Sequence, residues 1–232
     1  MMMGRADGGV GCEQVGKVGT GGQGDRRKCQ RLERGKALTV EEAKLLRRGV
    51  AGEAARAQQS GGWVAVRNQV LVELVLATGL RRAEVAGLDV EDLQVGGGDP
   101  EGWYLVVRCG KGGKRREVPL GRRVRGMVRG YLGWRQAREG VVPGGPLFVS
   151  ERSGRLSPNG VWRIFKGCCR RCGVSRRGLG VHGGRHRFAL DCLDQGASLL
   201  DVQALLGHDR LNTTYVYVRT PWDRRVRVVQ GL

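Results

Sequence analysis

The sequence predicts a mainly α (α+β) domain, in which helices form the core and a small β-hairpin or three-stranded sheet packs beside them. Residues 66–77 are apolar on nearly every side, as expected of a helix buried in the middle of a core. Residues 103–108 and 116–120 have strand-like composition and flank a glycine-rich turn, which predicts a hairpin. Helix-capping signals recur along the chain up to residue 207. Helices are therefore expected to dominate.

The first element of the domain is expected to be a helix that starts after Thr39. Thr39 and Glu42 have the spacing of a capping box, in which each side chain accepts a hydrogen bond from the backbone of the other residue. Residues 1–36 are rich in glycine and charge and cannot bury enough apolar surface to offset the entropy cost of ordering. We therefore expect residues 1–36 to be a flexible basic tail and residues 37–232 to form the domain.

A joint between two helices is expected at Arg81. Gly79 can end the buried helix in the left-handed conformation, and a short helix is expected over residues 82–88. The hairpin that follows has a basic tip, which contains Lys111 and Lys114. The local pattern thus places one arginine between helices and two lysines in a tight turn.

Further helices are expected downstream, each with its own start or stop signal. One covers residues 122–138, and another begins at Pro158 behind a Ser157 cap. A third is expected from about residue 185 to 195, and a fourth is expected to begin after Ser198 and to end at Gly207. A last short helix is expected near Asn212.

The charge of the chain predicts a polyanionic partner. Lys and Arg number 41 against 22 Asp and Glu, a formal net charge of +19. Such an excess favours nucleic acid. Membrane binding is disfavoured, because the basic residues are spread along the chain and no apolar stretch approaches the roughly 18 residues of a spanning helix. The first thirty residues also lack the apolar segment of a signal peptide, so a cytoplasmic location is expected.

Seven cysteines, three of them crowded at Cys168, Cys169 and Cys172, do not indicate a disulfide framework. Cys169 and Cys172 have the spacing of half a zinc site, but a tetrahedral site needs two further ligands. Only Cys192 and the histidines lie nearby in the sequence. We expect reduced cysteines on a basic helix and no metal.

The three histidines, His182, His186 and His208, all lie within residues 182–208. His182 and Arg185 are three residues apart at a predicted helix start, so their side chains can face one point where a helix N-terminus favours an anion. His208 follows Gly207 on a predicted turn. This pattern predicts a phosphate site, with His186 expected to pack beside it.

Residues 77–84 (ATGLRRAE) and 205–208 (LLGH), followed nine residues later by Tyr217, resemble the signature boxes of tyrosine recombinases of the phage integrase family. The likeness runs from about Leu38 to Arg219. It implies a tyrosine-recombinase-like catalytic domain and six site residues that match the family's motifs in order. These are Arg81, Lys111, His182, Arg185, His208 and Tyr217.

The resemblance implies a site-specific recombinase that cleaves and rejoins double-stranded DNA through a 3′-phosphotyrosine on Tyr217. A covalent intermediate keeps the bond energy, so no nucleotide cofactor and no metal are expected. Arg81 and Arg185 would donate fork-shaped hydrogen bonds to the non-bridging phosphate oxygens. The spacing from His208 favours Tyr217 over Tyr215.

The resemblance assigns the remaining roles. Lys111, with Lys114 as its nearest rival, would protonate the departing 5′ oxygen. His182 would accept or relay the tyrosine proton, and His208 would hydrogen-bond the phosphate. Apart from the resemblance, Glu84 is expected to orient Arg81, with a plain helix-surface charge as the alternative. The implied assembly is a homotetramer on two DNA sites, associated with the nucleoid.

Two departures from the family pattern leave alternatives open. Gly184 stands where a large apolar residue is usual, which is expected to remove a packing contact and to loosen His182 and Arg185. Arg187 is expected to face DNA as an added cation. We expect no separate N-terminal core-binding domain ahead of Leu38. Two alternative functions remain: a decayed recombinase that only binds DNA, and a relaxing enzyme like a type IB topoisomerase.

Overall fold

The computed structural model describes residues 37–95, 102–108, 115–140, 144–152, 154–176 and 178–207. The expected basic tail, the helix near Asn212, and the site residues Lys111, His208 and Tyr217 lie outside the described residues. The helices are α2 (Val40–Gln59), α3 (Val64–Thr78), α4 (Arg82–Gly87), α5 (Arg122–Glu139), α6 (Pro158–Arg171), α7 (Val181–Asp194) and α8 (Leu199–Leu206). A 3-10 turn, η1 (Val90–Asp92), and the strands β1 (Leu93–Val95), β2 (Trp103–Val107) and β3 (Arg116–Leu120) complete the described elements.

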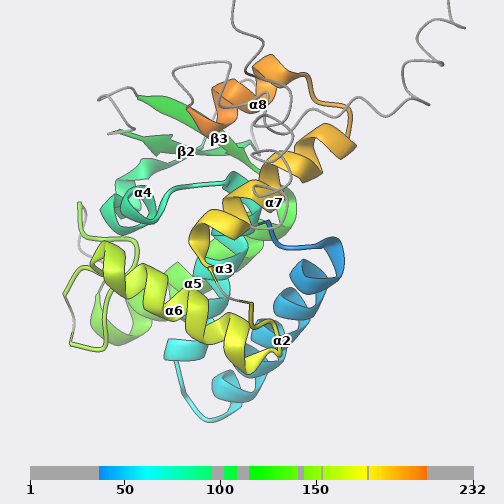
Figure 1. The fold of residues 1–232 in the computed structure, drawn as a ribbon. Helices are drawn as coiled ribbons and strands as arrows, with labels where there is room; N and C mark the ends of the chain where they lie inside the picture. The colour runs from blue at the N-terminus through cyan, green and yellow to red at the C-terminus, as the bar shows by residue number, and fades with distance from the viewer. Residues whose placement is uncertain are drawn as a thin grey trace, which may run out of the picture.

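Helix α3 is the centre of the fold, and α2, α5, α6 and α7 pack around it, as Figure 1 shows. The reason is the composition of α3, which is apolar on nearly all sides, so that burying each face against a neighbouring helix is favourable. Its acidic residue Glu73 is also buried, and it accepts hydrogen bonds from Arg47 and Arg123. The prediction of a helix buried in the middle of the core is confirmed.

The sheet lies at the end of the molecule where α8 packs (Figure 1), with the antiparallel order β1-β2-β3. The predicted hairpin strands pair in the register Leu105 with Val118, and both side chains are buried. Short β1 adds the third strand through Leu93, which pairs with Leu105. The prediction of a small hairpin or three-stranded sheet is confirmed.

The predicted helix boundaries that depend on local capping are confirmed. Thr39 and Ser198 each form a capping box, and the Ser157 hydroxyl accepts a hydrogen bond from a backbone N–H of α6. Gly79 and Gly207 end α3 and α8 in the left-handed conformation, each with a φ of 62°. The carbonyl oxygens of Gly79 and Gly207 accept hydrogen bonds from Arg185 and Arg81, two arginines of the site described below.

Helix α7 begins at Val181, earlier than the expected start near residue 185. Glycine has a low intrinsic helix propensity, but packing of α7 against α3 overrides it at Gly183 and Gly184. A Cβ atom on Gly184 would lie 2.8 Å from Val75 Cγ1 and 3.1 Å from Phe165 Cζ. The expectation of a lost packing contact at Gly184 is therefore wrong, because the neighbouring helices already fill the space of a side chain.

The expectation that Arg187 faces DNA is also wrong. The Arg187 side chain is 7% exposed, and it forms ion pairs with Asp191 at 2.8 Å and Asp194 at 3.0 Å on its own helix. These carboxylates neutralise its charge locally.

In the part of the chain that the structure describes, no helix is long and apolar enough to cross a membrane.

The cysteines of α6 face the interior. Burial raises the pKa of Cys168 to about 11 and that of Cys169 to about 12, from an ordinary value of 9.0. Half-buried Cys172 has a raised pKa for the same reason. Among the described residues, no group of three or more His, Cys, Asp or Glu side chains is placed to hold a metal ion.

We expect Cys168 and Cys169 to resist alkylation by iodoacetamide at pH 8 while the chain is folded. The thiolate is the reactive form, and a pKa at least two units above the ordinary value slows the reaction by at least about a hundredfold relative to urea-unfolded protein. Peptide-resolved mass spectrometry measures both rates. Rapid labelling of the folded protein would show that the end of α6 opens.

The raised pKa values of these thiols also predict that the free energy of unfolding falls as the pH rises from about 9, since the thiols of the unfolded chain ionise first.

Candidate active site

Three of the predicted site residues, Arg81, His182 and Arg185, line one pocket of about 410 Å³. Arg81 is the residue directly before α4, while His182 and Arg185 lie on the first turns of α7. The other lining residues come from the joint between α3 and α4, from α4 itself, from α6, from the loop before α7 and from α7. They are Leu80, Arg82, Trp162, Gly178, Gly180 and Val181. The fold thus brings together residues that lie about a hundred positions apart in the sequence.

Arg185 binds the C-terminal ends of two helices. Its Nη1 donates to Gly79 O and its Nη2 donates to Leu206 O, both at 2.7 Å, and its side chain is only 2% exposed. Carbonyl groups at a helix C-terminus carry partial negative charge, so the guanidinium is well placed to satisfy them. Arg185 therefore joins the end of α3 to the turn at Gly207, which His208 follows in the sequence.

Arg81 is held by Glu84, as expected. Glu84 Oε1 accepts a hydrogen bond from Arg81 Nη1, and Glu84 Oε2 accepts one from the Arg81 backbone N–H, both at 2.8 Å. Arg81 Nη2 also donates to Gly207 O at 3.3 Å. The Arg81 side chain remains 28% exposed, so it can meet a ligand in the pocket.

Arg116 is a further member of this cluster, although it is not among the site residues predicted from the sequence. Its Nη1 and Nη2 donate to the two oxygens of Glu84 at 2.9 and 2.8 Å, and its Nε donates to Leu205 O at 2.9 Å. A signal was present, because side chains alternate between the faces of a strand. Arg116 is in phase with Val118 and Leu120, which are the buried residues of β3.

Glu84 is a charged carboxylate at the centre of three guanidinium groups. Burial alone would raise its pKa, but hydrogen bonds from Arg116 and Arg81 outweigh burial and hold the pKa of Glu84 below its usual value. Arg185 Nη1 lies 4.0 Å from Glu84 Oε2. Because one carboxylate cannot neutralise three cations, the cluster keeps net positive charge for an anionic ligand.

The His182 side chain is exposed at the pocket, and its ring contacts the buried ring of His186. The His182 and His186 rings meet edge to face, with centroids 4.2 Å apart and planes at 79°. His186 is 2% exposed and packs beside the site, as expected. The buried ring of His186 therefore provides a packing surface for the exposed imidazole of His182.

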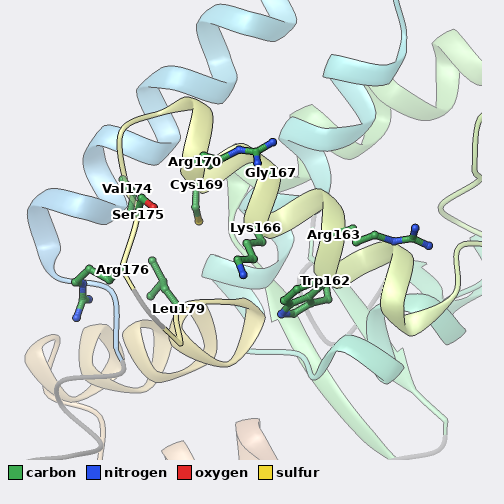
Figure 2. Close-up of a pocket in the computed structure, with 10 residues that line it drawn as sticks. All are labelled: Trp162, Arg163, Lys166, Gly167, Cys169, Arg170, Val174, Ser175, Arg176 and Leu179. Atoms are coloured by element: carbon green, nitrogen blue, oxygen red, sulfur yellow. The ribbon is translucent and has the colours of Figure 1, made fainter.

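A second pocket, of about 390 Å³, lies along α6 and shares Trp162 with the first (Figure 2). Arg163, Lys166 and Arg170 line it, and Lys166 Nζ lies 4.7 Å above the centre of a Trp162 ring. These positions are three and four residues apart, so they follow one face of α6. The positive surface therefore continues from the site along this helix.

Comparison with known proteins gives a consistent picture. A model of the phage integrase family matches residues 37–221. The tyrosine recombinase XerD of Mycobacterium leprae is 34% identical over 187 residues, which cover 78% of this chain and 56% of that protein. XerD of Mycobacterium tuberculosis is 35% identical over 186 residues, with the same coverage of 78% and 56%. The chain spans little more than half the length of these curated relatives.

A crystal structure of the XerH site-specific recombinase, bound to its difH substrate before cleavage, has a similar fold. The TM-score is 0.67 at 23% identity, and the match covers 84% of this chain and 53% of that chain. The predicted fold class, a mainly helical tyrosine-recombinase-like catalytic domain with a small sheet, is thereby confirmed.

Proposed function

The chain belongs to the phage integrase family, and from that membership we propose that it is a site-specific recombinase that cleaves and rejoins double-stranded DNA through a 3′-phosphotyrosine on Tyr217. The observation that carries the proposal is the convergence of Arg81, His182 and Arg185 on one pocket. Arg185 also binds the end of α8, from which the chain continues to His208. Residues 37–232 would form the catalytic domain and residues 1–36 a basic tail.

The arginines account for phosphate activation. A phosphodiester placed in the pocket would put its non-bridging oxygens between the guanidinium groups of Arg81 and Arg185. These groups are held before the substrate arrives, by Glu84 for Arg81 and by two helix-end carbonyls for Arg185. Donors held in advance stabilise the extra charge of the pentacovalent transition state without rearrangement during the reaction. His208 would add a hydrogen bond to the same phosphate.

The proton transfers follow from the remaining residues. The Tyr217 hydroxyl oxygen attacks phosphorus while its proton passes to His182, and the bond from phosphorus to the 5′ oxygen breaks. Lys111 donates a proton to that departing oxygen, which leaves a free 5′ hydroxyl and a 3′-phosphotyrosine. In the reverse step, a 5′ hydroxyl of a partner strand attacks phosphorus and returns its proton to Lys111. Tyr217 is then released and recovers its proton.

The partner in this proposal is duplex DNA, and the net charge of +19 supports it. We also propose that four copies assemble on two DNA sites, in the cytoplasm and with the nucleoid, because strand exchange needs four strands cut in one complex. A relaxing enzyme would instead act as a monomer on one duplex. The decayed-recombinase alternative loses its support at Gly184, since α7 is closely packed there.

The test is a covalent adduct on a nicked suicide substrate made from DNA that flanks the gene, at low salt and without magnesium. We expect a denaturant-resistant adduct with the wild type and with Tyr215→Phe, and a loss of at least about a thousandfold with Tyr217→Phe. Strand exchange between two such duplexes then separates recombination from relaxation. If all three proteins bind the DNA and none forms an adduct, the chain is a DNA-binding module.

A further inference from the structure

We propose that Arg116 is a positioning residue of this site, which holds Glu84 and the end of α8 so that Arg81 and the Gly207 turn keep the geometry that strand cleavage needs. This inference rests on the proposed function, and it adds a residue that lies outside the six motif positions. Arg116 is the first residue of β3, and it follows Lys111 by five positions.

The side chain of Arg116 joins three elements. Its two terminal nitrogens bind the carboxylate of Glu84 on α4, and its Nε binds Leu205 O on α8. The side chain is 9% exposed. An arginine fork matches a carboxylate in two parallel hydrogen bonds, and a lysine ammonium cannot reproduce both of these and the third bond at once. The contacts therefore depend on arginine in particular.

Arg116 shares both oxygens of Glu84 with Arg81. Oε1 accepts from Arg116 Nη1 and from Arg81 Nη1, while Oε2 accepts from Arg116 Nη2 and from the Arg81 backbone N–H. Arg116 thus fixes the rotation of the carboxylate that orients Arg81. It also balances the negative charge of Glu84, which lies 4.0 Å from Arg185. Without Arg116, the Glu84 carboxylate would neutralise more of the positive charge of Arg81 and Arg185, the two arginines proposed to bind the phosphate.

Arg116 also packs against the Gly207 turn. A Cβ atom on Gly207 would lie 3.1 Å from both Arg116 Cδ and Arg116 Nη1, so the turn rests directly on this side chain. Gly207 has a φ of 62° and ends α8. Removing Arg116 leaves Leu205 O without that donor and leaves space under the turn that leads to His208.

The experiment compares Arg116→Gln and Arg116→Lys with Arg171→Gln as a matched control. Arg171 forms two hydrogen bonds with Glu53, which link α6 to α2. Arg171 does not line the pocket that contains Arg81. Single-turnover adduct formation is measured at saturating DNA over a range of pH. We expect Arg116→Gln to lower the rate constant about thirtyfold, with DNA affinity changed less than about threefold, and Arg171→Gln to match the wild type.

Two readouts separate positioning from general structural damage. The Glu84 pKa, followed by carboxylate NMR, should rise in Arg116→Gln, and the acidic limb of the pH–rate profile should move up with it. In a Glu84→Gln background, Arg116→Gln should cost much less than in the wild type, because the two residues act through one contact. Arg116→Lys should recover part of the rate.

Each outcome decides one proposal. A wild-type rate in Arg116→Gln, full additivity with Glu84→Gln, or an unchanged Glu84 pKa would overturn the role of Arg116. A rise in the Glu84 pKa together with no wild-type adduct on a bound site would support the contact and overturn the proposed recombinase activity instead.

Discussion

Replacing Arg185 by methionine is expected to abolish DNA cleavage and to lower the free energy of unfolding by about 3 kcal/mol, since two buried carbonyls lose their donors at about 1–3 kcal/mol each. These carbonyls belong to Gly79 and Leu206, at the ends of α3 and α8. Methionine keeps much of the apolar volume, so the loss reports the hydrogen bonds and the charge. The loss of cleavage should exceed about a hundredfold, the usual effect of removing one oxyanion donor.

Urea unfolding and adduct formation measure the two effects of Arg185→Met. The control is Arg171→Met, which breaks an ion pair whose arginine is 46% exposed. Exposed pairs contribute little, so this variant should lose less than about 1 kcal/mol and keep its cleavage rate. Arg185→Lys retains a positive charge but loses the fork, and it should remain strongly impaired. Cleavage at the wild-type rate in Arg185→Met would remove Arg185 from the site.

Restoring a large apolar residue with Gly184→Leu is expected to destabilise the protein by about 3 kcal/mol, at the upper end of the usual cost of overpacking a core. The closest atoms to an added Cβ are Val75 Cγ1 at 2.8 Å and Phe165 Cζ at 3.1 Å, both from helices fixed by the core. Helix α7 would have to move outward and would carry His182 and Arg185 with it. Adduct formation should therefore fall together with stability.

Thermal unfolding of Gly184→Leu, Gly184→Ala and Gly130→Ala tests this expectation. Gly130 lies within α5, where an added Cβ meets nothing within 4 Å. Gly130→Ala should therefore stabilise by up to about 1 kcal/mol through helix propensity, whereas Gly184→Ala should not gain. Higher stability of Gly184→Leu than of the wild type would mean that α7 packs more loosely on α3 than the Gly184 contacts indicate.

Elements whose signals are local could be predicted from the amino-acid sequence. A capping box, a left-handed glycine or a strand alternation involves residues within a few positions of one another, so Thr39, Gly79 and the two hairpin strands could be predicted without knowledge of the fold. The family motifs likewise selected Arg81, His182 and Arg185, because their residue types and order reflect the chemistry of a phosphodiester. These three residues do line one pocket.

The contacts of the charged and small side chains could not be predicted in the same way, because they depend on the packing of the whole fold. Arg187 looked like a cation for DNA but faces two carboxylates of its own helix, and Gly184 looked like a missing contact but is the point where α7 approaches α3 closely. Arg116 carried no motif, yet it binds Glu84 and the end of α8. Burial and pairing depend on which surfaces the core brings together, and residues far apart in the sequence provide those surfaces.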